Sequence, residues 1–270
     1  MTARRHLVYT IALDYEGCCV HRNMAKMLVS SLLRTRFSGD VLVFHNSPIP
    51  LFQVPRVGIF EKSLKVPPEV SHRQFGEFVM RYKHGVAADL PMAGYDKVMF
   101  LDCDTIALRN IDHLLEGDWD LAFCVEPGSR IQDGAYGAYL TADERKHSRR
   151  EGINSGTWAV AASRCAELLE RWKELQTKPT GVNFRGFRDQ VTLNRVVLDW
   201  DGVAREFPRN EVALPLCNGH AHTYGGFSRA ALVHAASADG PDYKLRFLFS
   251  LFAGAFLYDT ELALLNIMEM

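Results

Sequence analysis

The chain has 270 residues, of which 47% are apolar and 23% are charged, and its formal net charge is −1. This length and composition suit one large α/β domain with a buried core, and they exclude a mainly disordered chain. A chain so close to neutral lacks the strong basic footprint of nucleic-acid-binding proteins, so we expect no nucleic acid among its partners.

Cysteines and apolar runs bear on the cellular setting. The six cysteines contain no CxxC pair, which removes zinc-finger spacing and favours a cytoplasmic protein in a reducing compartment. The N-terminal apolar run is too short for a signal peptide, and no run reaches the ~20 residues that span a membrane. Phe247–Tyr258 comes nearest, and we expect a buried helix there. Because Lys244 and Arg246 lie beside it, the alternative is peripheral contact of the 244–258 region with the inner face of a membrane.

The first hundred residues alternate between strand and helix patterns. Short apolar or β-branched runs predict strands over His6–Leu13, Val41–His45, Val57–Phe60 and Lys97–Leu101. Apolar residues at helical spacing predict helices over His21–Arg36 and Gln74–Asp89. This alternation indicates an α/β fold with a mostly parallel sheet and helices on both faces. No glycine-rich phosphate loop follows the first strand, so dinucleotide-binding and P-loop folds lose their main support.

The second half is more varied. We expect strands over Trp119–Val125, Ile153–Ala162 and Ala230–His234, and helices over Arg164–Gln176 and Arg188–Leu198. The long segment Gly128–Arg150 carries a basic cluster, which is either a solvated helix face or a lid that binds the acceptor of a reaction. We expect a single domain over residues 1–270, in which about 203–270 forms a variable part near an acceptor or a membrane.

Two carboxylates follow the strand Lys97–Leu101, in the sequence Asp102-Cys103-Asp104. Alternate residues of an extended chain point to the same side, and two adjacent carboxylates repel each other unless a cation lies between them. Mg²⁺ and Mn²⁺ prefer such oxygen ligands and commonly bridge to a substrate phosphate. The pattern therefore predicts a metal-diphosphate site at the carboxyl edge of the sheet, against the simpler alternative of a turn with two solvated aspartates.

Five segments in chain order resemble the retaining GT-A glycosyltransferases of the glycogenin and bacterial lipopolysaccharide galactosyltransferase kind. They are MRYKHGVAADLPMAGYDKV, KVMFLDCDTIALRNIDHLL, GINSGTWAVAAS, RDQVTLN and ALVHAAS, and the resemblance spans about Leu7 to Lys244. It implies a GT-A fold with a mixed, mostly parallel central sheet. The implied activity is metal-dependent transfer of a hexose from a nucleotide-diphosphate sugar, with a UDP-sugar as the default donor, to a glycan, lipid-linked or protein acceptor with retention of configuration.

The resemblance also implies a ligand set for the metal and contacts for the donor. Asp102, Asp104 and His234 would bind Mn²⁺ or Mg²⁺, which also places Asp102 at the donor. Arg81 and Lys83 would contact the phosphates or sugar of the donor. These assignments are carried over from the family and do not follow from spacing.

Further donor contacts are implied in the same way. Asp14 would face the nucleotide base. Gly240 stands where the family has a phosphate-binding lysine, and Lys244, ten residues after His234, is the candidate replacement. Asn154 and Asp189 would hydrogen-bond the hydroxyls of the donor sugar.

Gln190 would lie near the anomeric carbon, on the face away from the leaving group. For retention, Gln190 or Asp189 assists as a nucleophile, or the leaving phosphate itself takes the acceptor proton. An inverting transfer would instead need a base near the acceptor hydroxyl, for which Glu126, Asp133 or Asp189 are the available carboxylates.

Two other functions compete with this one. The altered segment Ser237–Lys244 is consistent with a nucleotide-sugar-binding protein that has lost catalysis. Phosphatases of the haloacid dehalogenase type also place DxD after a buried strand, but they need a threonine where Ile106 stands, and Thr105 is one residue early.

Overall fold

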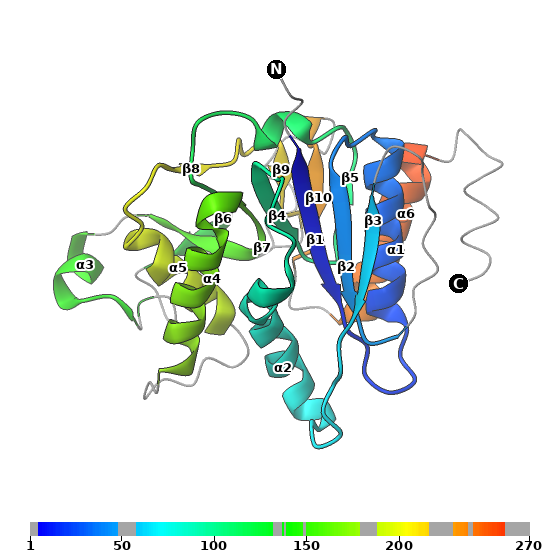
Figure 1. The fold of residues 1–270 in the computed structure, drawn as a ribbon, viewed down its shortest axis with the longest axis horizontal. Helices are drawn as coiled ribbons and strands as arrows, with labels where there is room; N and C mark the ends of the chain where they lie inside the picture. The colour runs from blue at the N-terminus through cyan, green and yellow to red at the C-terminus, as the bar shows by residue number, and fades with distance from the viewer. Residues whose placement is uncertain are drawn as a thin grey trace.

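The computed structural model describes residues 5–47, 58–131, 137, 139–147, 150–178, 188–215, 229–236 and 240–256. Figure 1 shows their arrangement as sheets flanked by helices. The helices are α1 (Val20–Arg34), α2 (His72–Gly85), α3 (Ala142–His147), α4 (Ala162–Thr177), α5 (Arg188–Leu198) and α6 (Pro241–Phe256), with 3₁₀ turns η1 (Ala87–Asp89) and η2 (Asp112–Leu115).

The larger sheet has seven strands within the described residues. They are β1 (His6–Ala12), β2 (Asp40–His45), β3 (Ile59–Ser63), β4 (Lys97–Leu101), β6 (Leu121–Arg130), β7 (Glu151–Ala161) and β8 (Ala204–Glu206). Their order is β3-β2-β1-β4-β7-β6-β8. Neighbours pair in parallel except that β7 runs antiparallel to both β4 and β6. This confirms the expected α/β fold with a mixed, mostly parallel central sheet.

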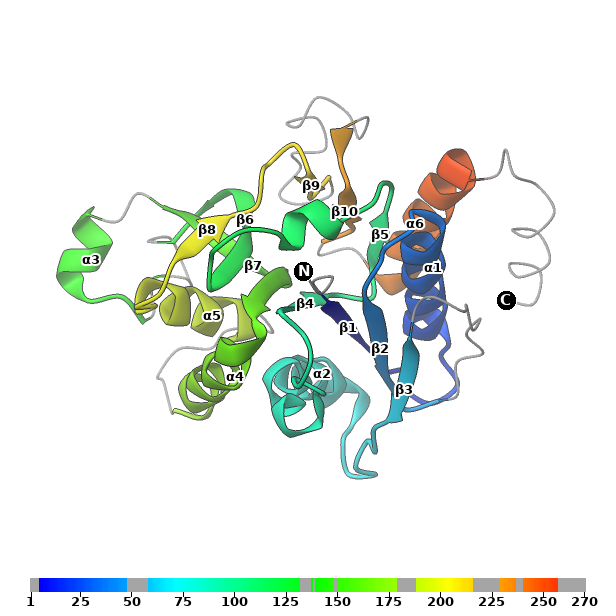
Figure 2. The ribbon, with the colours of Figure 1, turned by 45° about the horizontal axis from the view of Figure 1, so that its top comes forward.

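Alternation along the strands divides the apolar core into two clusters, one on each face of this sheet. Val8 and Met99 belong to the cluster that includes residues of α1 and α6, whereas Tyr9 and Phe100 belong to the cluster that includes residues of α2, α4 and α5. Successive side chains of a strand point to opposite faces, so a strand covered on both sides must be apolar throughout. Figure 2 shows α2, α4 and α5 on one side of the sheet and β5, β9 and β10 on the other.

An aromatic row joins the central strands to α4. The ring centroids of Tyr9 and Phe100 lie 5.0 Å apart, those of Phe100 and Trp158 lie 5.6 Å apart, and those of Trp158 and Trp172 lie 5.9 Å apart. Such pairs contribute about 0.5–1.5 kcal/mol each beyond the burial of their area. The Tyr9 hydroxyl also donates a hydrogen bond to the backbone carbonyl of Lys83 at 3.1 Å, which fixes the end of α2 over the sheet.

A second, smaller sheet has the order β5-β10-β9, in which β5 (Thr105–Ala107) lies antiparallel to β10 (Leu232–His234) and β9 (Val212–Ala213) lies parallel to it. These strands have three, three and two residues, and of the three only β10 coincides with a strand predicted from the sequence. Their pairing brings residues separated by more than a hundred positions next to each other, with Thr105 opposite His234.

The apolar segment near the C-terminus differs from the expected buried helix. It begins earlier, at Pro241, and of its side chains only Leu248 and Phe252 are buried, while Tyr243 and Phe249 are 51% and 37% exposed. Residues 257 and 258 lie outside the described residues. The helix packs along α1, whose Arg34 guanidinium lies 5.7 Å from the ring centroid of Phe252. No helix in the described ranges is long and apolar enough to cross a membrane.

Candidate functional site

Asp102, Asp104 and His234 meet where the two sheets adjoin. Asp102 directly follows β4, Asp104 directly precedes β5, and His234 is the last residue of β10. Backbone hydrogen bonds hold both aspartates: the Asp102 amide donates to the Gly156 carbonyl at 2.8 Å, and the Ala235 amide donates to the Asp104 carbonyl at 2.9 Å. Each aspartate is therefore an extension of a strand ladder, which places its carboxylate without help from a loop.

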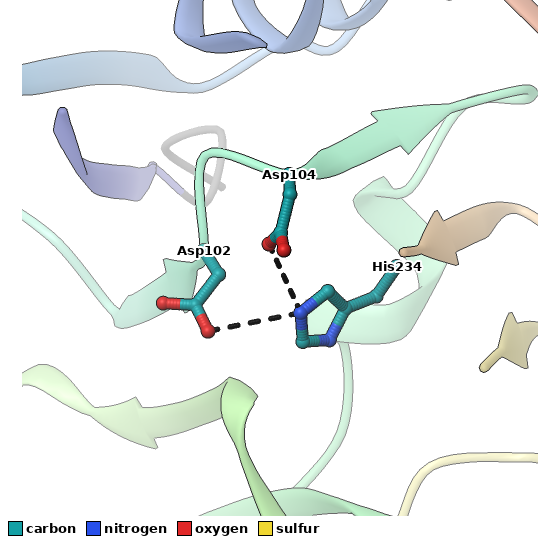
Figure 3. Close-up of side chains that lie close together, drawn as sticks. All are labelled: Asp102, Asp104 and His234. Carbon is teal, nitrogen blue, oxygen red and sulfur yellow. Dashed lines mark ion pairs between the residues drawn. The ribbon is translucent and has the colours of Figure 1, made fainter. Parts of the chain in front are cut away.

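The three side chains converge on one point, as Figure 3 shows. His234 Nε2 lies 3.1 Å from Asp104 Oδ1 and 3.7 Å from Asp102 Oδ2, and one ligand atom from each residue lies within 4.8 Å of the others. Neighbouring ligands of an octahedral ion with bonds of ~2.1 Å are about 3.0 Å apart, and opposite ligands are about 4.2 Å apart. Two carboxylates and one imidazole at these separations fit a divalent ion.

Gly156 of β7 leaves the space that this cluster occupies. A Cβ atom at residue 156 would lie 2.2 Å from His234 Cε1 and 2.3 Å from Asp102 Oδ2. Non-bonded atoms do not approach a carbon atom so closely, so any side chain at this position would push the histidine and the aspartate apart. The glycine is required by the cluster and not by its own backbone conformation.

Lys83, near the end of α2, neutralises one side of the cluster. Its ammonium lies 3.1 Å from both carboxylate oxygens of Asp102 and 3.0 Å from Asp189 Oδ2, and it is buried. Burial lowers the pKa of Lys83, but the two carboxylates outweigh burial and raise the pKa above its ordinary value. The lysine is therefore charged at any physiological pH.

Lys244 of α6 neutralises the other side. Its Nζ lies 2.7 Å from Asp104 Oδ2. Burial raises the pKa of Asp104, but the ammonium of Lys244 and the ring of His234 together hold that pKa well below its usual range. Three carboxylates, those of Asp102, Asp104 and Asp189, thus face two ammonium groups, which leaves a local charge of −1 when the histidine is neutral.

This charge balance has a direct consequence. A divalent cation would change the local charge from −1 to +1, so the same residues attract first a cation and then an anion. The side chains of Asp104 and His234 are 9% and 3% exposed, whereas that of Asp102 is 27% exposed. A ligand of the ion would therefore enter on the side of Asp102.

A second set of polar side chains, from the start of α5 and from β7, lies beside the cluster. Ser155 Oγ donates to Asp189 Oδ2 at 2.7 Å and accepts from Lys83 Nζ at 3.3 Å. Gln190 Oε1 accepts from the Ser155 amide and from Asn154 Nδ2, both at 3.3 Å. Asn154, Asp189 and Gln190 are all buried. The structure thus brings these three residues together and links them through Lys83 to Asp102.

Two expected donor-binding residues lie elsewhere. Arg81 is on the exposed face of α2, where its guanidinium pairs with Glu77 at 2.6 Å. The carboxylate of Asp14 is buried and accepts from the backbone amides of His21 at 2.9 Å and Arg22 at 3.2 Å, so it caps the first turn of α1. Neither contact lies in the cluster, and the donor-binding roles of both residues stay predictions.

Two expected residues cannot be placed, and two residues of the site were not expected. Asp133 and Ser237 lie outside the described residues. Ser155 and Gly156 were not among the expected site residues, although both lie within the INSG sequence. The only available signal was their place beside Asn154, and spacing along a strand does not show that β7 runs directly past the end of β4.

One family model, that of the nucleotide-diphospho-sugar transferases, matches residues 52–248, and no curated protein matches the chain. The matched stretch contains all three members of the Asp102–Asp104–His234 cluster and also Lys83, Asp189 and Lys244. It supports a GT-A-like family and does not separate the glycogenin and galactosyltransferase branch from the others, so that narrower resemblance stays a prediction. The chain belongs to the nucleotide-diphospho-sugar transferase family and is a glycosyltransferase that uses a nucleotide-sugar donor.

Proposed function

We propose that the protein is a metal-dependent hexosyltransferase that moves a sugar from a UDP-sugar to an acceptor hydroxyl with retention of anomeric configuration. The observation that carries this proposal is the convergence of Asp102, Asp104 and His234, from three separate elements, in a chain of this family. The DxD pair by itself is a short motif. A third ligand from the end of β10, and the glycine that makes room for it, support a built metal site.

The residues present fit Mn²⁺ or Mg²⁺, with Asp102, Asp104 and His234 as the protein ligands. When bound, the ion would act as a Lewis acid for the diphosphate leaving group. Lys83 and Lys244 flank the cluster on opposite sides and supply two further fixed positive charges. Fixed charge near a developing negative charge lowers the barrier because no reorganisation is needed during the reaction.

Asn154, Asp189 and Gln190 are placed to hold the donor sugar. The two contacts that the structure describes for the Asp189 carboxylate, from Ser155 Oγ and Lys83 Nζ, both use Oδ2. Its other oxygen is therefore the one that a sugar hydroxyl, or an anomeric carbon, would meet. Gln190 or Asp189 as a nucleophile, and direct proton transfer to the leaving phosphate, remain three alternatives for retention.

The proposed acceptor is a glycan, a lipid-linked sugar or a protein, and we expect the variable part of the chain, about 203–270, to contact it. Support for peripheral membrane contact comes from α6, where Tyr243, Arg246 and Phe249 are exposed along one helix. Exposed aromatic and basic residues on a helix suit an anionic membrane surface.

An inactive nucleotide-sugar-binding protein is the competing proposal, because Gly240 stands where the family has its phosphate-binding lysine. Lys244 already contacts Asp104 at 2.7 Å, which supports its service as the substitute. The phosphatase alternative loses its support, since the chain belongs to a transferase family.

A screen of nucleotide sugars for metal-dependent release of nucleoside diphosphate tests the proposal. Wild-type protein is compared with Asp102→Asn and Asp104→Asn over a Mn²⁺ titration, and exposed Asp118→Asn serves as the control carboxylate. We expect release with at least one UDP-sugar, loss of about 10²–10³-fold in both ligand variants, and no change in the control. Equal release by the ligand variants contradicts the metal assignment. Tight binding of UDP with Mn²⁺ by calorimetry, without any release, supports the inactive binding protein.

A further inference from the structure

The side-chain amide of Gln190 is held at both ends. Its Oε1 accepts hydrogen bonds from the Ser155 amide and from Asn154 Nδ2, and its Nε2 donates to Glu126 Oε2. The two ends of a glutamine amide have nearly the same shape but opposite hydrogen-bonding character. A backbone N–H can only donate and a carboxylate can only accept, so the two partners select the same orientation of the amide.

Glu126 reaches α5 because β6 is irregular at this point. The register between β6 and β7 shifts between Val125 and Arg130, so Glu126 lies outside the regular ladder. Gly128, with a φ of 75°, allows the strand to turn two residues later. Glu126 is half-buried while Gln190 is buried, so the carboxylate approaches the glutamine from the solvent side.

A series of contacts links this carboxylate to the metal cluster. Gln190 contacts the Ser155 amide, Ser155 Oγ accepts from Lys83, and Lys83 pairs with Asp102. Glu126 therefore lies at the end of a buried polar network whose other end is a candidate metal ligand. Networks of this kind restrict the side chains between their ends more than an isolated pair does.

We infer that Glu126 is a positioning residue, whose carboxylate holds the Gln190 amide with its oxygen toward Ser155 and its nitrogen outward. This inference rests on the proposed function, in which Gln190 lies beside the anomeric carbon of the donor sugar. The role differs from that of a general base for an inverting transfer, because it needs only that Glu126 accept a hydrogen bond. A residue that orients another contributes to the rate and contributes little to the binding of the donor phosphates.

Glu126→Gln removes the selection, since the new amide group can donate or accept. We expect kcat to fall about 10–100-fold, as is typical for loss of a residue that orients a ligand, with the KM for the donor within about threefold of wild type. Glu206→Gln on β8 is the matched control, because it makes the same change on the strand adjacent to β6 in a residue that pairs with Arg209. An unchanged kcat in Glu126→Gln, or a rise in KM that accounts for the whole loss, overturns the inference.

A sharper test exchanges the two side chains, so that glutamate stands at position 190 and glutamine at position 126. Gln190→Glu places two carboxylates against each other, and we expect a lower melting temperature and a low kcat. Adding Glu126→Gln restores a donor opposite an acceptor, so the double variant should recover the melting temperature and regain at least tenfold in kcat over Gln190→Glu. In a Gln190→Ala background, Glu126→Gln should change neither quantity. If Glu126→Gln changes the melting temperature and kcat by the same amount in the Gln190→Glu and Gln190→Ala backgrounds, the two side chains do not interact, and the inference is contradicted.

The melting temperatures are measured without donor or metal, which separates the two proposals. If wild-type protein releases nucleoside diphosphate from no nucleotide sugar, the proposed function fails. The melting temperatures of the single and double variants still establish or refute the contact between Glu126 and Gln190. If wild-type protein is active and the cycle shows no coupling, the positioning role alone is refuted. Glu126→Asp, which keeps the charge on a shorter side chain, provides a second variant if Glu126→Gln does not fold, and it should retain part of the wild-type kcat.

Discussion

The two sheets of this molecule differ in size and in what they contribute. The large sheet buries apolar residues on both faces, and it contributes to the site through two inner strands: Asp102 follows the end of β4, and β7 carries Gly156. The small sheet has strands of two or three residues, yet Asp104 adjoins β5 and His234 ends β10. The longer strands belong to the first sheet, whereas two of the three candidate ligands adjoin or end strands of the second.

A binding site and an apolar core have different physical requirements. A core needs apolar area, which long strands and amphipathic helices supply in proportion to their length. A metal site needs a few atoms at defined separations, which two short ladders deliver when each fixes one backbone segment. The junction of the two sheets, and not either sheet alone, makes the cluster, so changes at the junction should have the largest effects.

The strongest test of the junction leaves every candidate ligand in place. Gly156→Ala puts a methyl carbon 2.2 Å from His234 Cε1 and 2.3 Å from Asp102 Oδ2, which is much closer than van der Waals contact, and we expect Mn²⁺-dependent activity to fall about 100-fold as the ligands separate. Gly76→Ala in α2, where the added carbon meets no atom within 4 Å, is the control. Retention of wild-type Mn²⁺ affinity in Gly156→Ala, measured by calorimetry, would show that the glycine is not needed for the cluster.

Lys83→Met probes the charge balance on the side of the large sheet. Two carboxylates would lose their buried partner, so we expect the free energy of unfolding to fall by about 3 kcal/mol in metal-free buffer. Mn²⁺ should restore part of the loss, because the ion neutralises Asp102. Lys62→Met removes a surface pair with Asp89 and should cost under about 1 kcal/mol with no response to Mn²⁺. Chemical denaturation with and without the ion measures both, and equal losses in the two variants would contradict the prediction.

Lys244→Met probes the side of the small sheet, and it should strengthen the binding of the metal ion while it weakens the binding of the nucleotide. Asp104 loses a positive neighbour at 2.7 Å, so Mn²⁺ should bind about tenfold more tightly. A nucleoside diphosphate should bind the Mn²⁺-loaded variant less tightly, because one of the two flanking cations is gone. Calorimetry with each ligand measures the two affinities, with Arg246→Met as the exposed control on the same helix. Weaker binding of both ligands would place Lys244 in support of the fold and not in charge balance.

The smallest effect is expected far from the junction, at α3 between β6 and β7. Hydrogen bonds from the Thr141 amide and from Arg195 lower the pKa of Glu144 from 4.5 to about 2. Since the pKa in the folded state lies below that of the unfolded chain, this contribution to stability is present above pH 4.5 and is lost as the pH falls toward 2. Hydrogen exchange, corrected for its intrinsic pH dependence, should show protection of α3 declining over this interval relative to α4. Glu144→Gln should show no such decline, and an identical decline in that variant would exclude Glu144 as its cause.

Local pattern determined much of the large sheet and its helices. The predicted strand Lys97–Leu101 and the predicted helix Arg188–Leu198 have the observed bounds, because the first is a short, mostly apolar run and the second has apolar residues at helical spacing. For the segment near the C-terminus, the predicted start and the predicted burial were wrong. Its apolar residues favour a helix, but which of them are buried depends on how α1 packs against it. The sequence of one segment does not show which other segment packs against it.

The sequence also indicated which residue types make up the site. Asp102 and Asp104 stand out as a pair of carboxylates after a buried strand, and resemblance to a family supplied His234, Lys83, Asn154, Asp189 and Gln190 as further members. The distances between these residues depend on contacts that no local pattern contains: β10 pairs with β5, β7 leaves room at Gly156, and Glu126 faces Gln190. Strands of two or three residues carry too few side chains to show a period, and contacts across more than a hundred residues depend on the packing of everything between them.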